Sequence, residues 1–410
     1  SLIGFVAFVI ALSGGIVDAQ TPSPSPAASA SASATATSSP AADLGAQRID
    51  ELFTKPHVSP DIFAAVFLNQ VSASKVEEIV SQLKAGLGEY KGVKKADDHY
   101  VATFAKGTDD VFIHFDAENK IDGLFFKTPR LAAASLDDAL KRLAALPGRV
   151  SYLVLKGRNQ LAALDADAPL SVGSTFKLAI LNALVDEVNA GRLRWDQSVP
   201  LRGTWKSLPS GVLQTWPDGS AITLQTYATL MISQSDNTAA DALHSIVGAA
   251  ALARYRGPND PFLTTLQVFK LKSAAGRELL RKYRSASTAM AREAILRELD
   301  RLPRPKASDL ALDPRDLDIE WHYSAARSCD LIRRVADLPL FSVNPGVADA
   351  AQWKAVAYKG GSDAGVINMT TFLRARDGTA YCVSATENDR AKAIDETAFS
   401  AAYGAVLGQL

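Results

Sequence analysis

The pattern of hydrophobic and polar positions changes three times along the chain. Residues 1–19 are apolar, and residues 20–46 are dominated by Pro, Ser, Ala and Thr. A helical and then an alternating pattern follows over 47–130, and from 136 to 410 strand-like runs stand at both ends of a helical middle. The pattern predicts an apolar leader, a linker and two folded domains.

The apolar run at 1–19 predicts a signal peptide that is cleaved after Val17-Asp18-Ala19. It is short for a membrane span, is broken by Gly14-Gly15, and precedes a linker that cannot pack a core. We therefore expect an exported protein, periplasmic or secreted, with no stable membrane span after signal cleavage. An uncleaved anchor is the alternative.

The first domain, 47–130, is predicted to be a small α+β module. A helix is expected from Ser74, with Glu77 three residues on as a capping box. Three strand-like runs follow, at 100–105, 110–115 and 121–126. Helices followed by an antiparallel meander indicate one compact domain in which a layer of helices packs on a sheet. No catalytic pattern stands out in this domain.

The second domain, 136–410, is predicted to be α+β as well. Helix 136–146 and strands 150–155 and 161–164 open it, and a helix at 394–407 closes it. Before that last helix stand three further strands, at 354–359, 366–374 and 379–385, the last two joined by the turn Asp377-Gly378. We expect the two groups of strands to form one antiparallel sheet packed against the central helices.

Composition narrows the possible partners. The 44 basic and 44 acidic side chains cancel, and no basic run suggests nucleic acid as a partner. The five histidines are scattered, so neither a metal site nor another cofactor is expected. The two cysteines, Cys329 and Cys382, either pair or lie apart as small buried side chains.

The first chemical motif is Ser174-Thr175-Phe176-Lys177, which opens an apolar helical run. A serine hydroxyl is a weak nucleophile unless a base lies beside it. A lysine one turn away in an apolar site loses affinity for its proton, so the pair can act as nucleophile and base. The same spacing occurs at Ser72/Lys75 and Ser81/Lys84, so spacing alone does not identify the site.

Two further motifs follow in order. Ser235-Asp236-Asn237 interrupts two helical runs, and supplies a hydroxyl that can relay a proton and a carboxamide that can bind an amide. Lys359-Gly360-Gly361-Ser362 ends an apolar strand. There the lysine can bind a substrate carboxylate, the glycines leave room for substrate, and the Ser362 N–H can help form an oxyanion hole.

Together the three motifs resemble those of the serine β-lactamase and penicillin-binding superfamily, class A β-lactamases above all. The resemblance extends over about 136–410 and is strongest over 231–243 (MISQSDNTAADAL). A small domain ahead of such a domain also resembles a two-domain subgroup typified by a protein of clavulanic acid biosynthesis, whose N-terminal part has an isomerase/cyclase-like fold. Members of that subgroup act weakly as β-lactamases or as cephalosporin esterases.

The resemblance implies a role for each motif residue. Ser174 is acylated, Lys177 deprotonates it, and Ser235 passes a proton to the leaving nitrogen. Lys359 supports that transfer and binds the substrate carboxylate, while the backbone N–H groups of Ser174 and Ser362 hold the oxyanion. Asn237 contacts the amide of the substrate side chain.

Two departures from the class A pattern stand out. Gly360 takes the place of a Thr or Ser that contacts the substrate carboxylate. The Glu-x-x-Leu-Asn segment that activates the deacylating water is missing, and Glu278 and Glu320 are expected to be solvated helix residues rather than its replacement.

The sequence therefore predicts a serine hydrolase that acts through an acyl-enzyme, as in β-lactam hydrolysis, on a small-molecule substrate. An esterase or D-alanyl peptidase of the same superfamily is one alternative. A non-hydrolytic penicillin-binding sensor or scaffold is the other.

Overall fold

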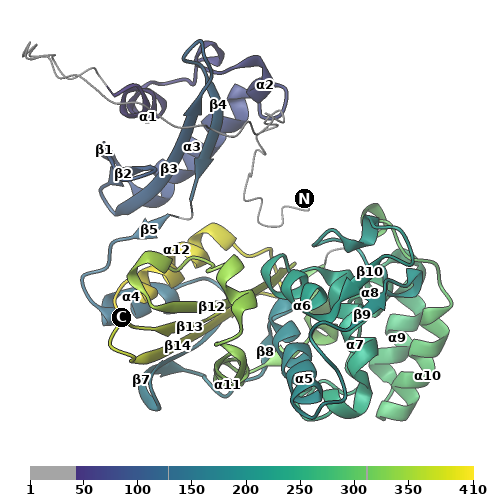
Figure 1. The fold of residues 1–410 in the computed structure, drawn as a ribbon. Helices are drawn as coiled ribbons and strands as arrows, with labels where there is room; N and C mark the ends of the chain where they lie inside the picture. The colour runs from purple at the N-terminus through teal and green to yellow at the C-terminus, as the bar shows by residue number, and fades with distance from the viewer. Residues whose placement is uncertain (1–42, 128, 311–312) are drawn as a thin grey trace, which may run out of the picture. The chain divides into compact units, whose positions relative to one another are not determined.

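The structure is a computed structural model that describes residues 43–127, 129–310 and 313–410. The chain divides into two compact units, Ser1–Ala132 and Ala133–Leu410 (Figure 1). The predicted signal peptide and nearly all of the predicted linker lie outside the described residues. Within the described ranges, none of the helices has the length and hydropathy needed to cross a membrane.

The first unit is an antiparallel sheet with helices packed on it. Its strand order is β1-β2-β3-β4, with β5 paired to β3. The helices are α1 (Leu44–Thr54), α2 (Ala65–Leu68) and α3 (Ala73–Leu87), and a 3-10 turn, η1, spans Pro60–Ile62. The strands are β1 (Tyr90–Lys95), β2 (Tyr100–Phe104), β3 (Gly107–Phe115), β4 (Ile121–Phe126) and β5 (Arg130–Leu131).

Two sequence expectations for this unit need correction. Helix α1 begins at Leu44, capped by Asp43, so the folded part starts before residue 47. The cap of α3 is Ser72, whose hydroxyl accepts from the Lys75 N–H, and not Ser74. Glu77 accepts instead from the Val58 N–H at 3.0 Å and so fastens α3 to the preceding loop.

The second unit contains the antiparallel sheet β12-β13-β14-β6-β7, so the two predicted groups of strands do join. The mixed α+β class expected for this unit is confirmed. Its strands are β6 (Arg149–Lys156), β7 (Asn159–Leu164), β12 (Ala355–Asp363), β13 (Val366–Arg374) and β14 (Ala380–Asn388). Two separate two-stranded sheets are also present. In one, β8 (Leu170–Ser171) pairs with β11 (His322–Tyr323), and in the other, β9 (Ser198–Pro200) pairs with β10 (Ala221–Thr223).

Helices lie on both faces of this sheet (Figure 1). Cys382 of β14 is bonded to helix α11, whereas the hydroxyl of Tyr403 in α12 donates to the Thr371 hydroxyl of β13. Thr371 precedes Phe372, the register partner of Cys382, and successive strand residues point to opposite faces. The helices of the unit are α4 (Leu136–Ala144), α5 (Lys177–Asn189), α6 (Leu224–Ser233), α7 (Asn237–Leu252), α8 (Thr265–Lys272), α9 (Arg277–Ser285), α10 (Ala289–Asp300), α11 (Ala325–Val335) and α12 (Glu396–Leu407).

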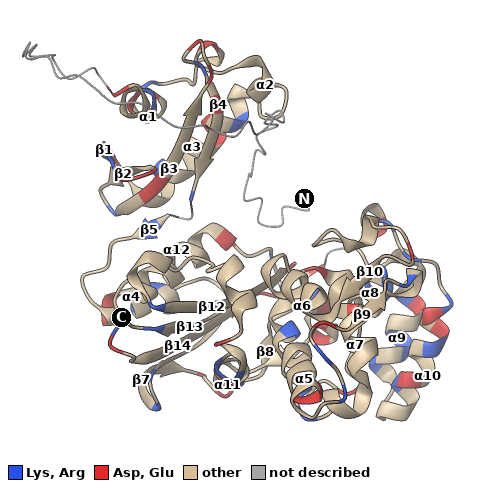
Figure 2. Cartoon of the chain, in the orientation of Figure 1, with Lys and Arg blue, Asp and Glu red and all other residues tan. Residues whose placement is uncertain are grey.

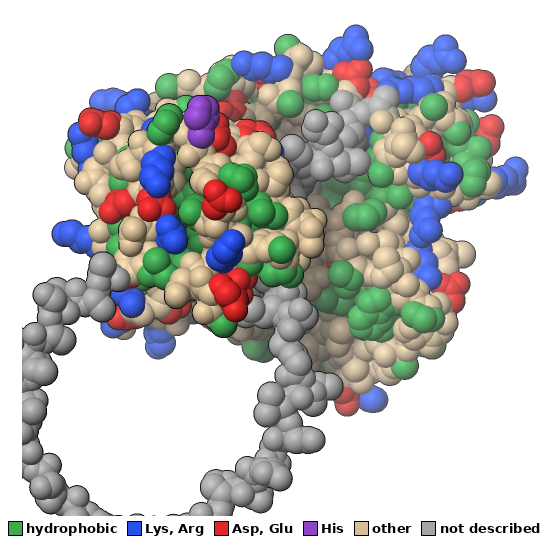
Figure 3. Space-filling view, turned by 90° about the horizontal axis from the view of Figure 1, so that it is seen from above, with side chains coloured by type: hydrophobic (Ala, Val, Ile, Leu, Met, Phe, Trp, Pro, Cys, Tyr) green, Lys and Arg blue, Asp and Glu red, His purple; other side chains and the backbone are tan. Residues whose placement is uncertain are grey.

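Charged residues of both signs occur along two helices of the second unit. Lysine, arginine and acidic residues alternate along α9 and α10 (Figure 2). The face shown in Figure 3 also has both signs interspersed. This distribution agrees with the formal net charge of zero.

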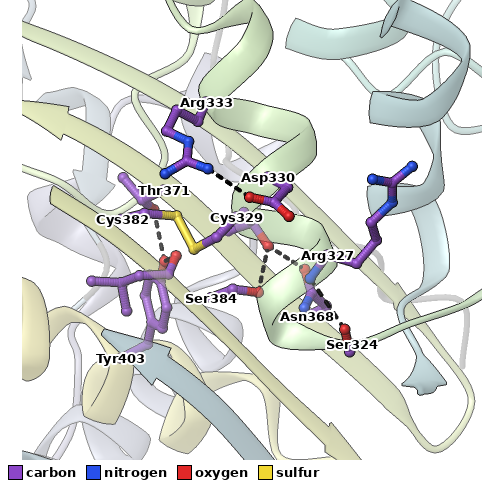
Figure 4. Close-up of a disulfide and its surroundings, with 12 residues drawn as sticks. Ser324, Arg327, Cys329, Asp330, Arg333, Asn368, Thr371, Cys382, Ser384 and Tyr403 are labelled. Atoms are coloured by element: carbon purple, nitrogen blue, oxygen red, sulfur yellow. Dashed lines mark hydrogen bonds and ion pairs between the residues drawn. A yellow bond between two sulfur atoms is a disulfide. The ribbon is translucent and has the colours of Figure 1, made fainter. Parts of the chain in front are cut away.

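The two cysteines form a disulfide, Cys329–Cys382, that joins α11 to β14 (Figure 4). Both are 3% exposed or less and belong to the main apolar core. The open question about their pairing is thereby answered: the bond ties a helix to the sheet across 53 residues of chain.

We expect the double variant Cys329→Ala/Cys382→Ala to have a free energy of unfolding lower by about 4 kcal/mol, because a cross-link that closes a 53-residue separation restricts the unfolded chain. Denaturant unfolding with and without reductant measures this. Reductant should destabilise the wild type and leave the double variant unchanged. Equal stability of the wild type in both conditions would contradict the prediction.

Candidate active site

Ser174 and Lys177 lie where the 3-10 turn η2 (Gly173–Phe176) runs into α5. The Lys177 Nζ donates to the Ser174 Oγ at 3.1 Å. The ammonium is fully buried, and this burial lowers the pKa of Lys177 to about 7, although the carboxylates of Asp236 and Asp241 act in the opposite direction. A lysine with such a pKa is partly neutral near pH 7 and can accept the hydroxyl proton.

Ser235 stands between the two buried lysines. It lies in the break between α6 and α7, with a positive φ of 55°. Its Oγ accepts from Lys177 Nζ at 3.1 Å and from Lys359 Nζ at 3.0 Å. Burial, and secondarily the charge of Lys177, lower the pKa of Lys359 well below its usual range. The three motifs therefore meet in one hydrogen-bonded chain from Ser174 to Lys359.

Asp236 and Asn237 hold this arrangement together. Asp236 caps α7 through the Ala239 N–H and also accepts from the backbone at Val212, 2.6 Å away, in the facing loop. Asn237 Oδ1 accepts from Lys177 Nζ at 2.6 Å, and its Nδ2 donates to the Leu208 carbonyl at 3.0 Å. Since both ends of this carboxamide already bond the protein, Asn237 positions Lys177 in this structure. The carboxamide nitrogen carries two hydrogens, so the predicted contact with a substrate amide is compatible with both of these bonds.

The third motif lies inside β12 rather than at its end, because the strand continues to Asp363. Two glycines let β12 approach η2. A Cβ at Gly361 would lie 2.3 Å from the Ser174 backbone nitrogen, and one at Gly173 would lie 2.9 Å from the Ser362 nitrogen. Only residues without side chains permit such an approach. It brings together the two backbone N–H groups predicted to form an oxyanion hole.

Gly361→Ala should lower the rate of Ser174 acylation about 100-fold, because the added methyl group forces β12 away from Ser174 and misplaces one oxyanion donor. Gly404→Ala is the matched control, since a Cβ at Gly404 of α12 meets nothing within 4 Å. Intact mass measured over time gives the rate of adduct formation for each of the two variants. Wild-type acylation by the Gly361 variant would contradict this interpretation of the close approach.

Residues that the sequence patterns did not single out also lie around the candidate active site. Asp241, four residues after Asn237 on α7, is buried, and burial raises the pKa of its carboxyl to about 7. A carboxylate one helical turn beyond a motif, in an otherwise apolar run, was the available signal. The Ser210 hydroxyl donates to the Ser235 carbonyl at 2.7 Å, and the Trp321 ring stacks on Phe176 with centroids 3.7 Å apart. These two contacts join distant segments and leave no local pattern.

The two glutamates considered as deacylating bases lie in different environments. Glu278 is an exposed residue of α9 paired with Lys282, as expected. Glu320 is not solvated: it is 6% exposed, follows the 3-10 turn η7 (Pro314–Ile319) and forms a buried ion pair with Lys272. Burial raises the pKa of Glu320, although the ammonium of Lys272 acts in the opposite direction. The same lysine also holds Asp363 at 2.7 Å, so Glu320 belongs to a buried three-charge cluster.

The histidines of the first unit lie against carboxylates. His99 contacts Asp98 and Asp110, and His114 contacts Asp122. Among the residues that the structure describes, no group of three or more His, Cys, Asp or Glu side chains could hold a metal ion.

Residues 133–313 match the model of a family described as the beta-lactamase enzyme family. The matched segment includes the first two motifs, whereas Lys359 and Ser362 lie beyond it. No curated protein matches the chain.

Solved structures similar to the chain include β-lactamases and a penicillin-binding protein. The β-lactamase from Sphaerobacter thermophilus DSM 20745 is 19% identical, with 66% of this chain and 94% of that one covered and a TM-score of 0.46. A β-lactamase from Chitinophaga pinensis DSM 2588 is 17% identical, with 67% and 97% covered and a TM-score of 0.45. PBP-A is 15% identical, with 67% and 94% covered and a TM-score of 0.45.

Proposed function

We propose that the chain is a serine hydrolase of the β-lactamase superfamily that forms an acyl-enzyme on Ser174. One observation carries this proposal: the three motifs meet around two buried lysines, with Ser174 and Ser235 both within 3.1 Å of Lys177 Nζ. The family match over residues 133–313 supports it independently.

The chemistry follows from these contacts. Neutral Lys177 takes the proton of Ser174 Oγ, which attacks the substrate carbonyl and forms a tetrahedral oxyanion near the N–H groups of Ser174 and Ser362. When the bond from the carbonyl carbon to the leaving nitrogen or oxygen breaks, Ser235 gives its proton to the leaving atom. Lys177 then returns a proton to Ser235, because the two already share a hydrogen bond.

Removal of the acyl group is the slower half of the proposed cycle. Hydrolysis needs a base for the attacking water, and the buried carboxylate of Glu320 is held by Lys272. Lys177 hydrogen-bonds the Ser174 oxygen that would carry the ester, and it is the group we propose for both steps. Esters, whose leaving group needs less protonation than an amide nitrogen, should acylate Ser174 faster than amides. Because the leaving group departs before hydrolysis of the acyl-enzyme, an ester and an amide that deliver the same acyl group should be turned over at the same rate.

Export to the periplasm or the medium is part of the proposal. The disulfide Cys329–Cys382 supports it, since such bonds persist in oxidising compartments. We also propose that the whole chain is related to the two-domain subgroup whose first domain has an isomerase/cyclase-like fold.

The test combines three substrates with two readouts. The purified chain is incubated with benzylpenicillin, a chromogenic cephalosporin and a nitrophenyl ester, while intact mass and absorbance are followed together. An adduct that maps to the peptide of Ser174 and decays with product release supports the hydrolase. A lasting adduct without turnover supports the sensor alternative, and no adduct with any substrate would refute acylation of Ser174.

A further inference from the structure

Helix α8 is fastened at both ends by buried charged side chains. Its first turn is held by Asp241 of α7, whose carboxylate accepts from the backbone N–H groups of Thr265 at 2.7 Å and Leu266 at 2.9 Å. Asp241 lies one turn after Asn237 on α7. The last residue of α8 is Lys272, which is buried. One end of α8 is thus fixed to the helix that follows the second motif, and the other end carries an ammonium group.

The Lys272 ammonium binds two carboxylates from distant parts of the chain. It donates to Glu320, and to Asp363 at 2.7 Å. The side chain of Lys272 is 4% exposed, that of Glu320 1% and that of Asp363 18%. Burial lowers the pKa of Lys272, but the two carboxylates raise it by more, so the ammonium stays protonated. A buried charge that loses its partner is strongly disfavoured, and these contacts therefore hold three segments together.

Asp363 fixes the end of the strand that carries Ser362. It follows Ser362 as the last residue of β12 and pairs with Val366 at the turn into β13. Its Oδ2 accepts from Lys272, and its Oδ1 accepts from the Ala364 N–H at 2.7 Å. Both oxygens of this carboxylate thus hold the strand end that supplies one of the two predicted oxyanion donors, the Ser362 N–H.

Glu320 stands one residue from the backbone that holds the other predicted donor, the Ser174 N–H. The next residue, Trp321, accepts from the Val172 N–H through its carbonyl at 3.0 Å and stacks its ring on Phe176. Val172 precedes η2 and Phe176 ends it, with Ser174 between them. The segment that begins at Glu320 therefore contacts η2 on both sides of the nucleophile.

From these contacts we infer that Lys272 is a positioning residue for the oxyanion hole of the proposed acyl transfer. Through its two carboxylate partners it sets the spacing between the Ser174 and Ser362 N–H groups. The inference rests on the proposed function and adds a residue that acts only through others. Gly173 and Gly361 permit β12 to approach η2, and the ion pairs of Lys272 hold it there. Removal of an oxyanion donor costs about 100- to 1,000-fold in rate, so a loosened donor should cost on the order of tenfold.

Two esters that differ in one atom test the spacing of the hole. They are a nitrophenyl ester and its thiono analogue, in which sulfur replaces the carbonyl oxygen. The rate at which each labels Ser174 is measured by intact mass and divided by the rate of alkaline hydrolysis of the same compound. Sulfur is larger than oxygen and a weaker hydrogen-bond acceptor, so a rigidly spaced hole should favour the oxygen ester. A loosened hole should lose part of this preference.

Asp363→Asn keeps an acceptor for the Ala364 N–H and removes the charge that Lys272 binds. Since Lys272 retains Glu320 as its partner, this variant should fold. We expect its rate with the oxygen ester to fall about tenfold, and the ratio of the two ester rates to fall by a similar factor. Lys272→Met should lower the ratio at least as far, because it removes both ion pairs. Misfolded protein lowers both rates alike and leaves the ratio unchanged.

Asp316→Asn is the matched control and should retain the wild-type ratio. Asp316 is a buried carboxylate of η7 that binds Arg277 and Arg284, so the same substitution there also breaks buried ion pairs, but with partners on α9. The rate of Asp363→Asn with benzylpenicillin, which needs the same hole, should fall by the same factor as with the oxygen ester.

The outcomes separate the inference from the proposed function. A wild-type ratio in Asp363→Asn, or a wild-type rate of this variant with benzylpenicillin, would overturn the inference while acylation of Ser174 stands. A wild type that reacts equally with both esters would also overturn it, since no spacing would then be selected. Absence of an adduct from the oxygen ester and from benzylpenicillin would refute the proposed function together with the inference.

Discussion

Ser174→Ala is expected to lose the covalent adduct completely with every substrate that labels the wild type. The Ser174 Oγ is the only atom of this side chain that can form the acyl bond, and its hydrogen bond to Lys177 at 3.1 Å makes it the activated hydroxyl of the site. Ser235 is not expected to replace it, because its proposed role is to protonate the leaving atom. Intact mass after incubation with a penicillin and with a nitrophenyl ester measures the loss.

The chain contains its own control for this experiment. Ser81 has the same spacing to Lys84 as Ser174 has to Lys177, but it is exposed on α3 of the first unit. Ser81→Ala should form the adduct at the wild-type rate. An adduct of unchanged yield on Ser174→Ala would show that a different nucleophile reacts and would remove the basis of the proposed mechanism.

Lys177→Ala is expected to lower the rate of acylation by about 10²–10⁴-fold, the usual contribution of a positioned general base. In the wild type the rate should depend on pH through the same side chain. Burial lowers the pKa of Lys177 to about 7, so the lysine is protonated and inactive below this pH and neutral and active above it. The rate should therefore rise with pH through about 7 and then level off, and this rise should vanish in Lys177→Ala.

Stopped acylation reactions at a series of pH values, followed by intact mass, give the profile. Lys75→Ala is the matched control, since Lys75 repeats the Ser-x-x-Lys spacing but is an exposed partner of Glu78. A wild-type rate that does not change with pH would show that Lys177 is not the base. A rate that falls as the pH rises through about 7 would show the same.

Several elements were predictable because local patterns set them. Strand β13 has the bounds expected from sequence, 366–374, and Asp377-Gly378 does form the turn to β14, with a φ of 88° at Gly378. Strand β1 was missed, because its residues, YKGVKK, show no alternation and none of them is buried. An edge strand of this kind is formed by pairing with its neighbour, which no local pattern reveals.

The candidate site divides in the same way. The three motifs and their order could be recognised in the sequence, because each is a short run of reactive side chains. The environment of each side chain could not be predicted from the sequence. Glu320 was expected in solvent and lies in a buried ion pair with Lys272, 48 residues away in the chain. The hydrogen bond from Lys177 to Asn237 was not predicted either.

By itself, the sequence determined the α+β class of the second unit, most of its strands and the identity of the motif residues. These depend on periodicity and on residue type over a few neighbouring positions. Only the tertiary structure decided that Cys329 pairs with Cys382 and that Lys177 is fully buried beside Ser235. Such contacts join segments tens of residues apart. Burial and charge act through space, and only the folded chain places these groups together.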